Sequence, residues 1–182
     1  MKQRFHINIE IKAKCANFDK IRKVLKRKGA LFVGKDHQVD TYFVVHKGRL
    51  KLREGKIENS LIYYERPNIA GPKQSNVTLF KSAPDSFLKE ILLKSLKVLV
   101  VVDKQREIYF IGNVKFHLDT VKNLGSFVEV EAIDESGKIG KEKLRKQCEE
   151  YLRLLKITDN DLISESYSDL LMRNLSLRTR RV

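Results

Sequence analysis

A strict alternation of apolar and polar residues near the N-terminus constrains the fold more than any other feature of this sequence. Residues 5–14 read Phe-His-Ile-Asn-Ile-Glu-Ile-Lys-Ala-Lys. Successive side chains of a β-strand point to opposite faces, so this period of two predicts a strand with one apolar face. The other face carries His6, Asn8, Glu10, Lys12 and Lys14.

The same alternation recurs in four later segments, and the repetition carries functional information. An antiparallel sheet with one solvated face would explain any single segment. Taken together, one set of strands offers all the carboxylates and another set offers only cations, whereas a surface selected for solubility mixes the two signs more evenly. The polar positions are Arg49, Lys51 and Arg53; Lys104 and Arg106; Lys115, His117 and Asp119; and Glu129 and Glu131, which follow Phe127.

Helix signals interrupt the strands and close the chain. Asn17 suits a helix N-cap, and Gly29 suits the end of the same helix. About eight strands predict a barrel or a strongly curved antiparallel sheet, with the long helices covering its outside and enclosing the polar face. Further strands are expected at 31–35, 38–46, 49–54, 60–66, 76–81, 98–112, 114–121 and 126–132, and helices at 17–28, 84–96 and 138–155, with shorter ones near 159–163 and 167–173.

Length and composition indicate a globular protein. With 182 residues, 42% hydrophobic and 33% charged, the chain predicts one domain over residues 1–182. We expect an exposed loop at 67–75 and a disordered basic tail at 173–182. The longest apolar run, 98–102, is far too short to span a membrane. Two isolated cysteines, Cys15 and Cys148, and the absence of a leader predict a cytoplasmic protein.

The net charge of +14 predicts a polyanionic partner: nucleic acid, an acidic membrane or a phosphorylated small molecule. Enclosed charges of one sign are costly unless something neutralises them. Clustered carboxylates favour a hard divalent cation, Mg²⁺ or Mn²⁺, and convergent Arg and Lys side chains favour phosphate oxygens. A metal-bound polyphosphate satisfies both sets. The carboxylates are Glu10, Asp119, Glu129 and Glu131, and the cations are Lys51, Arg53, Lys104 and Arg106.

Several stretches, in this order and spacing, resemble the CYTH domain, whose members are also called triphosphate tunnel metalloenzymes. The resemblance covers residues 6–172, and it implies an α+β fold: an eight-stranded antiparallel β-barrel forming a triphosphate tunnel, with helices packed on the outside. The stretches 64–67 and 166–171 are most similar to the class IV adenylate cyclase branch. The main stretches are Glu10-Ile-Lys12, Asp40-Thr-Tyr-Phe43, Arg49-Leu-Lys-Leu-Arg53, Lys104-Gln-Arg106 and 118–131.

The resemblance also implies roles for individual residues. Divalent metal would be held by Glu10, Glu129 and Glu131, with Asp119 at a nearby acidic position. Glu10, Lys12 and Arg53 are expected to take part in catalysis. The residues expected to bind the triphosphate are Lys12, Lys51, Arg53, Arg66, Lys81, Lys104 and Arg106.

One position departs from the family pattern. The family signature opens Glu-x-Glu-x-Lys, whereas this chain reads Asn8-Ile-Glu10-Ile-Lys12. An amide oxygen can ligate a metal but brings no negative charge, so we expect weaker Mg²⁺ binding. Two consequences stay open: the amide spares metal binding bridged by substrate phosphates, or it marks a protein that binds triphosphates without rapid turnover.

The leading hypothesis is a class IV adenylate cyclase that converts ATP to cyclic AMP and pyrophosphate. The alternatives are hydrolysis of thiamine triphosphate, inorganic triphosphate or a nucleoside triphosphate, and a non-catalytic module that binds polyphosphate, nucleotide or RNA. Nucleic acid is the less favoured partner because Glu129 and Glu131 would repel backbone phosphates. We expect no membrane partner, and the resemblance is compatible with a homodimer.

The remaining polar and aromatic residues favour structural roles. No histidine stands at metal-ligand spacing from another, and a neutral histidine in a polar wall is usually structural. Tyr167 is interpreted as a packing residue, while Tyr63, Tyr64 and the 67–75 loop are candidates for shaping a base pocket. The four histidines are His6, His37, His46 and His117.

Overall fold

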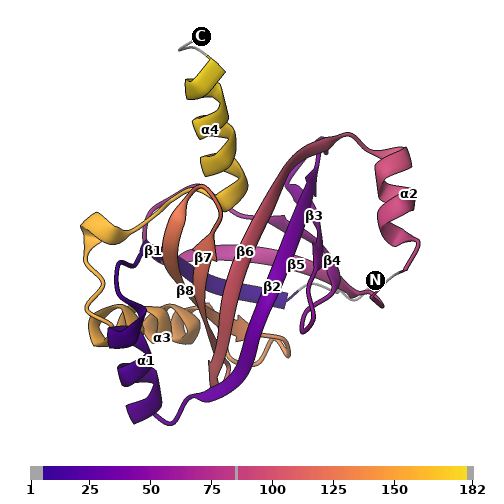
Figure 1. Ribbon diagram of the computed structural model, residues 1–182. Coiled ribbons are helices and arrows are strands. Elements are labelled where there is room, and N and C mark those ends of the chain that lie inside the picture. Colours follow the sequence, from indigo (N-terminus) through magenta and orange to yellow (C-terminus); the bar gives the residue numbers. More distant parts are fainter. Residues whose placement is uncertain (1–5, 85, 180–182) are drawn as a thin grey trace.

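Eight antiparallel strands close into a barrel in the computed structural model, which describes residues 6–84 and 86–179 (Figure 1). The strand order around the barrel is β1-β5-β4-β3-β2-β6-β7-β8, and the first and last strands pair with each other. The expected eight-stranded barrel is therefore confirmed. Its strands are β1 (His6–Lys14), β2 (Leu31–Phe43), β3 (Arg49–Glu54), β4 (Ser60–Glu65), β5 (Lys73–Lys81), β6 (Val98–Ile111), β7 (Val114–Val121) and β8 (Gly125–Asp134).

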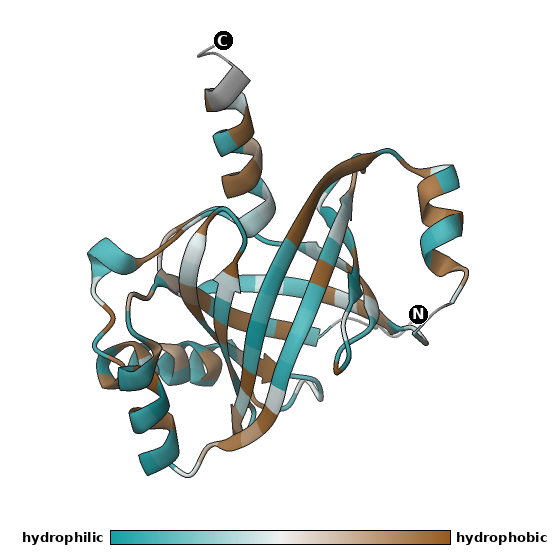
Figure 2. Cartoon of the chain, viewed as in Figure 1, coloured by the Kyte–Doolittle hydropathy of each residue, from teal (hydrophilic) through white to brown (hydrophobic). Residues whose placement is uncertain are grey.

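The apolar faces of β1, β7 and β8 point outward, beneath two helices. Ile9 and Ile11 of β1 are 1% exposed and belong to the same buried cluster as Leu25 of α1 (Phe18–Arg27) and Leu144 of α3 (Lys141–Leu154). Burying this outer apolar face leaves the alternate, polar residues of each strand to face the interior. Figure 2 shows the resulting mixture of hydrophilic and hydrophobic residues along single strands.

A capping residue and apolar packing explain the positions of two outer helices. The Asn17 side chain accepts hydrogen bonds from the backbone of Asp19 and Lys20 and caps α1, as the sequence predicts. On another part of the barrel, α2 (Leu88–Ser95) places Leu92 against Phe43 and Leu52. Both helices use a narrow apolar stripe to cover outward-facing strand residues.

The last helix, α4 (Tyr167–Thr179), has a different position. Its first turns place Tyr167, Leu170 and Leu171 among inward-facing apolar residues, including Val102 and Phe127. The rest of α4 extends away from the barrel (Figure 1). This helix thus covers one end of the barrel interior, while the helices predicted to cover the outside of the barrel, α1, α2 and α3, pack against its outer face.

Several element boundaries differ from those expected. The segments 31–35 and 38–46 form one strand, β2, which has an irregular register between Phe32 and Gly34. Strand β5 begins at Lys73, inside the expected 67–75 loop, because β1 offers a partner edge there, with Glu10 opposite Lys73. Helix α2 begins at Leu88 rather than near 84, and a short 3₁₀ helix occupies Asp159–Asp161.

The basic C-terminal segment expected to be disordered is helical as far as Thr179, because α4 continues beyond the predicted 167–173. Residues 180–182 of that segment lie outside the described residues. Within the described part of the chain, no helix combines the length and hydrophobicity that crossing a membrane would require.

Candidate active site

The barrel encloses a cavity of about 720 Å³, large enough for a nucleotide-sized ligand. Among the described residues, seven cations and six carboxylates line it, so their formal charges sum to only +1. The lining cations are Lys12, Lys51, Arg53, Arg66, Lys81, Arg106 and Lys115; the carboxylates are Glu10, Asp40, Glu58, Glu129, Glu131 and Glu135.

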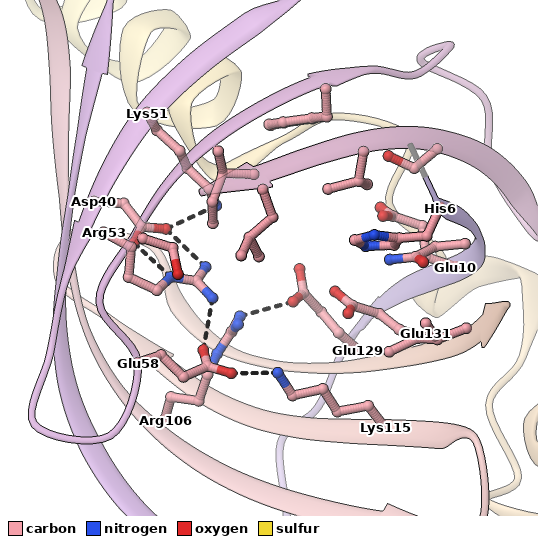
Figure 3. A pocket seen from close by; sticks show the side chains of 18 of the residues that line it. His6, Glu10, Asp40, Lys51, Arg53, Glu58, Arg106, Lys115, Glu129 and Glu131 are labelled. Carbon is pink, nitrogen blue, oxygen red and sulfur yellow. Dashed lines mark hydrogen bonds and ion pairs between the residues drawn. The ribbon is translucent and has the colours of Figure 1, made fainter. Parts of the chain in front are cut away.

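The structure brings together most of the residues selected from the sequence, from strands far apart in the chain (Figure 3). Lys81 lines the cavity but is otherwise exposed. Lys104 and Asp119 are buried behind the cavity wall and do not line it. Four charged residues that the sequence analysis did not select, Asp40, Glu58, Lys115 and Glu135, do line it.

Asp40 of β2 is the centre of one charged cluster. Its Oδ1 accepts a hydrogen bond from Nε of Arg53 at 2.9 Å, and its Oδ2 accepts from Nζ of Lys51 at 2.9 Å and of Lys104 at 2.7 Å. Burial alone would raise the pKa of Asp40, but Arg53, Lys104 and Lys51 hold it well below its usual range. Burial lowers the pKa of Lys104 to about 7, against the opposing attraction of Asp40. Asp40 stays ionised in either state of Lys104, because Arg53 and Lys51 remain beside it.

Arg106 of β6 is the centre of a second cluster. Its Nε donates to Oδ1 of Asp119 at 2.6 Å, and its Nη2 donates to Asp119 and, at 2.7 Å, to Oε2 of Glu129. The Tyr167 hydroxyl also donates to Asp119, at 2.8 Å. The strand register places Asp119 directly opposite Arg106, so Asp119 positions both Arg106 and Tyr167. Its two oxygens already accept three hydrogen bonds, which leaves little capacity for a metal ion.

Tyr167 does more than pack. Its ring lies 3.6 Å from Nζ of Lys12, so the ring face stabilises that ammonium group. Lys12 also lies 3.2 Å from Oε1 of Glu129. The first turn of α4 thus holds one cation of β1 and, through Asp119, one cation of β6.

Acidic side chains gather where β1, β7 and β8 meet. The register places Glu10 opposite Glu131, and His117 opposite Glu129. His117 Nδ1 lies 3.3 Å from Oε2 of Glu129 and 3.8 Å from Oε1 of Glu131. Burial, with Glu10 and Glu129 nearby, raises the pKa of Glu131 to about 7, and burial with Arg106 nearby lowers the pKa of His117 to about 3. Neutral His117 is thus a candidate ligand beside Glu129 and Glu131.

Comparison with known proteins identifies the family to which this chain belongs. Residues 6–167 match the family model described as the CYTH domain. The chain belongs to the CYTH family. Members of this family are generally metal-dependent enzymes that act on triphosphates.

Three relatives show how far the CYTH likeness extends. A Methanocaldococcus jannaschii protein named as a putative adenylate cyclase is 27% identical over 176 residues, which cover 90% of this chain and 98% of that protein. The PH1012 protein of Pyrococcus horikoshii has the same fold, with a TM-score of 0.76, 27% identity and 90% and 98% coverage. The Hippeastrum protein HpAC1, described as a putative adenylyl cyclase that reveals a dominant triphosphatase activity, matches in fold with a TM-score of 0.61 at 12% identity, covering 94% of this chain and 96% of that one.

The residues on the acidic side of the cavity are suited to binding a divalent cation. The amide oxygen of Asn8 is buried in the cavity wall and accepts no hydrogen bond from the described residues. Glu131 lies one strand away, on the same polar face as Glu10. An oxygen donor without a partner next to clustered carboxylates is suited to Mg²⁺ or Mn²⁺. Asn8 therefore keeps a ligand atom at the position where the family signature has a glutamate.

The CYTH cavity also contains donors for an anion. Arg66 follows β4, and its side chain is only 3% exposed. One terminal nitrogen, Nη1, donates to Glu10, while Nε and Nη2 have no hydrogen-bond partner among the described residues. Buried guanidinium donors without partners are costly, and phosphate oxygens would satisfy them.

Sequence reasoning selected every described cation on the cavity wall except Lys115, but it missed Asp40 and Glu58, two of the carboxylates that hold these cations. Asp40 and Lys115 stand at alternating positions in β-strands, so their pattern was a usable signal. Glu58 lies in the connection between β3 and β4, where alternation gives no information. The predicted segregation of charges is also incomplete, since nearly every cation on the cavity wall already contacts a carboxylate.

Proposed function

We propose that this protein is a metal-dependent enzyme that acts on a triphosphate, with the conversion of ATP to cyclic AMP and pyrophosphate as the first candidate reaction. The observation that carries the proposal is Arg66, which lines a cavity rich in cations and has two buried donors without a hydrogen-bond partner in the described part of the chain. Family membership and the M. jannaschii relative support the same reaction class.

The charge of the cavity supports a requirement for metal. A formal lining charge of +1 cannot balance the several negative charges of a triphosphate. Asn8, Glu10, Glu129, Glu131 and His117 offer oxygen and nitrogen donors to a divalent cation. When bound, the cation would neutralise phosphate charge and favour deprotonation of the nucleophile.

The protein's own side chains would position the substrate and stabilise the charge that develops during the reaction. In cyclisation the ribose 3′-oxygen bonds to the α-phosphorus, the bond from this phosphorus to the bridging oxygen breaks, and pyrophosphate leaves while the hydroxyl proton passes to water. Arg53, Arg66 and Arg106 would hold the phosphates in line and stabilise the leaving group. Apolar lining residues, among them Leu79 and Phe110, would accommodate the adenosine.

Hydrolysis of a triphosphate is the second candidate. The Hippeastrum protein with this fold is described as having a dominant triphosphatase activity, and the same cations would serve an attacking water. In this reaction water attacks the terminal phosphorus, the bond from this phosphorus to the bridging oxygen breaks, and the diphosphate leaves while the terminal group becomes inorganic phosphate and a proton passes to water. Thiamine triphosphate, inorganic triphosphate and ATP are the substrates to compare.

The test is incubation of the protein with each triphosphate and Mg²⁺ or Mn²⁺, with product analysis. Cyclic AMP from ATP supports the cyclase, and phosphate release alone supports the triphosphatase. An Arg66→Gln variant should lose at least about tenfold in triphosphate affinity, since each charged hydrogen bond contributes about 1.5–3 kcal/mol. Arg22→Gln is the matched control, because Arg22 pairs with Glu107 and does not line the cavity. Binding without any product would reject an enzyme, and absence of binding would reject the site.

A further inference from the structure

Glu58 projects from the connection between β3 and β4 into the cavity, onto two of its cations (Figure 3). Its Oε2 accepts hydrogen bonds from Nη1 of Arg53 at 2.8 Å and from Nε2 of Gln38 at 2.9 Å. Its Oε1 accepts from Nζ of Lys115. Donors from β2, β3 and β7 therefore converge on one carboxylate.

These three donors form an anion seat, which we define as Gln38, Arg53 and Lys115. A guanidinium, an ammonium and an amide directed at one point match a phosphate group at least as well as a carboxylate. Asp40 holds Arg53 through Nε and Nη2, at 2.9 and 3.0 Å, so Nη1 is aimed at the seat whether or not Glu58 is there. The Arg53 part of the seat is thus positioned independently of Glu58.

The two carboxylates on Arg53 differ in their freedom to move. The side chain of Asp40 is 2% exposed and binds three cations, so it is part of the scaffold. The side chain of Glu58 is 21% exposed and borders the cavity, where a rotamer change can carry its carboxylate away from the seat. Glu58 is therefore the one of the two that a ligand can replace.

Hydrogen bonds to Asp36 fix the backbone around Glu58. Asp36, fully buried, accepts hydrogen bonds from the backbone N–H groups of Lys56, Ile57 and Glu58 at 2.7, 3.1 and 3.1 Å. A side chain at Gly55 would place its Cβ 2.5 Å from Oδ2 of Asp36, so only glycine fits there. Exchange at the seat then requires rotation of one side chain and no opening of the connection.

We propose that the anion seat is a phosphate subsite, that Glu58 fills it in the free protein, and that a phosphate of the substrate displaces the Glu58 carboxylate. The proposal deepens the proposed function and rests on it. Glu58 compensates two cations while the site is empty, and it competes with every incoming anion. Only a ligand with high charge density, such as a polyphosphate, exchanges with it effectively, which makes Glu58 a specificity-determining residue.

The test is calorimetric binding of inorganic triphosphate, with and without Mg²⁺, to wild type and to Glu58→Gln. Loss of the competing charge should tighten binding about tenfold, the factor that corresponds to one charge-assisted hydrogen bond. Glu135→Gln is the matched control, because Glu135 lines the same cavity and, among the described residues, its carboxylate forms no hydrogen bond or ion pair with the seat; the affinity of this variant should differ from wild type about twofold or less. Adding Lys115→Met should remove most of the gain, since the seat then lacks one donor.

The outcomes separate this proposal from the proposed function. Unchanged or weaker binding to Glu58→Gln, while wild type binds triphosphate, overturns the subsite and leaves the proposed function standing. Failure of wild type and all variants to bind triphosphate or ATP overturns both. Glu58→Asp provides a second test if Glu58→Gln does not fold, because the shorter side chain keeps its charge but withdraws from the seat; tighter binding supports displacement, and equal binding contradicts it.

Discussion

At the scale of single residues, the cavity is governed by carboxylates that orient cations. Asp40 holds Arg53, Lys51 and Lys104, and Asp119 holds Arg106. A fixed guanidinium loses less entropy when it binds phosphate than one that moves freely. These two aspartates act through the residues that they position.

Asp40→Asn should strongly destabilise the protein. The variant leaves buried cations facing a neutral amide, and removing one partner of a buried ion pair costs about 3–5 kcal/mol. The measurement is the free energy of unfolding in urea. Asp103→Asn is the control: the Asp103 side chain is 38% exposed, and its pairs with His37 and Lys122 should contribute about 1 kcal/mol or less. Equal losses in the two variants would contradict the role assigned to Asp40.

At the scale of elements, α4 determines the shape of the cavity by covering one end of the barrel. In the sequence, the segment 166–171 resembles one branch of the CYTH family, falls in a predicted short helix near 167–173, and contains Tyr167, interpreted there as a packing residue. In the structure its Tyr167 contacts Asp119 and Lys12, while Leu170 and Leu171 pack among inward-facing apolar side chains. The first turns of α4 thus contact both the apolar residues at this end of the barrel interior and the charged residues in its middle.

Leu170→Ala should therefore lower the free energy of unfolding by about 2–5 kcal/mol, the usual cost of deleting a buried leucine side chain. Leu170 is 7% exposed and belongs to the cluster beneath α4. Met172→Ala, two residues along the same helix at a position 40% exposed, should change it by about 1 kcal/mol or less. A similar loss in both variants would indicate that the helix end, and not this packing, stabilises the barrel.

At the scale of the whole molecule, the positive charge and the cavity are largely separate. The chain carries a formal charge of +14, while the described cavity lining contributes +1. Most of the excess therefore belongs to residues outside that lining, such as the exposed Lys20, Lys23 and Lys26 of α1. The sequence argument from net charge to a phosphorylated ligand was too direct, because internal ion pairs neutralise most of the cavity.

This separation predicts how triphosphate binding responds to ions. An enclosed site is screened weakly by salt, whereas binding to an exposed basic surface falls steeply. We expect the Kd of inorganic triphosphate to change less than about threefold between 50 and 200 mM KCl. Removing Mg²⁺ with a chelator should weaken binding about tenfold or more, because metal supplies the charge that the lining lacks. A steep salt dependence with no metal dependence would place the anion on the outer surface.

Much of the fold and part of the site could be predicted from the sequence. Alternation is a local property of a strand, so the polar face of Glu10 and Lys12, and that of Glu129 and Glu131, were visible without coordinates. The chemistry of those residue types pointed to metal and phosphate. Their proximity inside one cavity then followed from closing the sheet into a barrel.

What only the tertiary structure decided is which charges meet. Arg53 lies 13 residues from Asp40 in the sequence, Lys104 lies 64 from Asp40, and Lys115 lies 57 from Glu58. These pairs depend on strand order and register, and a shift of one residue would turn each side chain to the opposite face. The sequence by itself thus determined which strand faces are polar and which charged residue types they carry. Barrel closure decided that Asp119 would hold Arg106 and that Glu58 would occupy the anion seat, because ion pairing depends on distance in space and not along the chain.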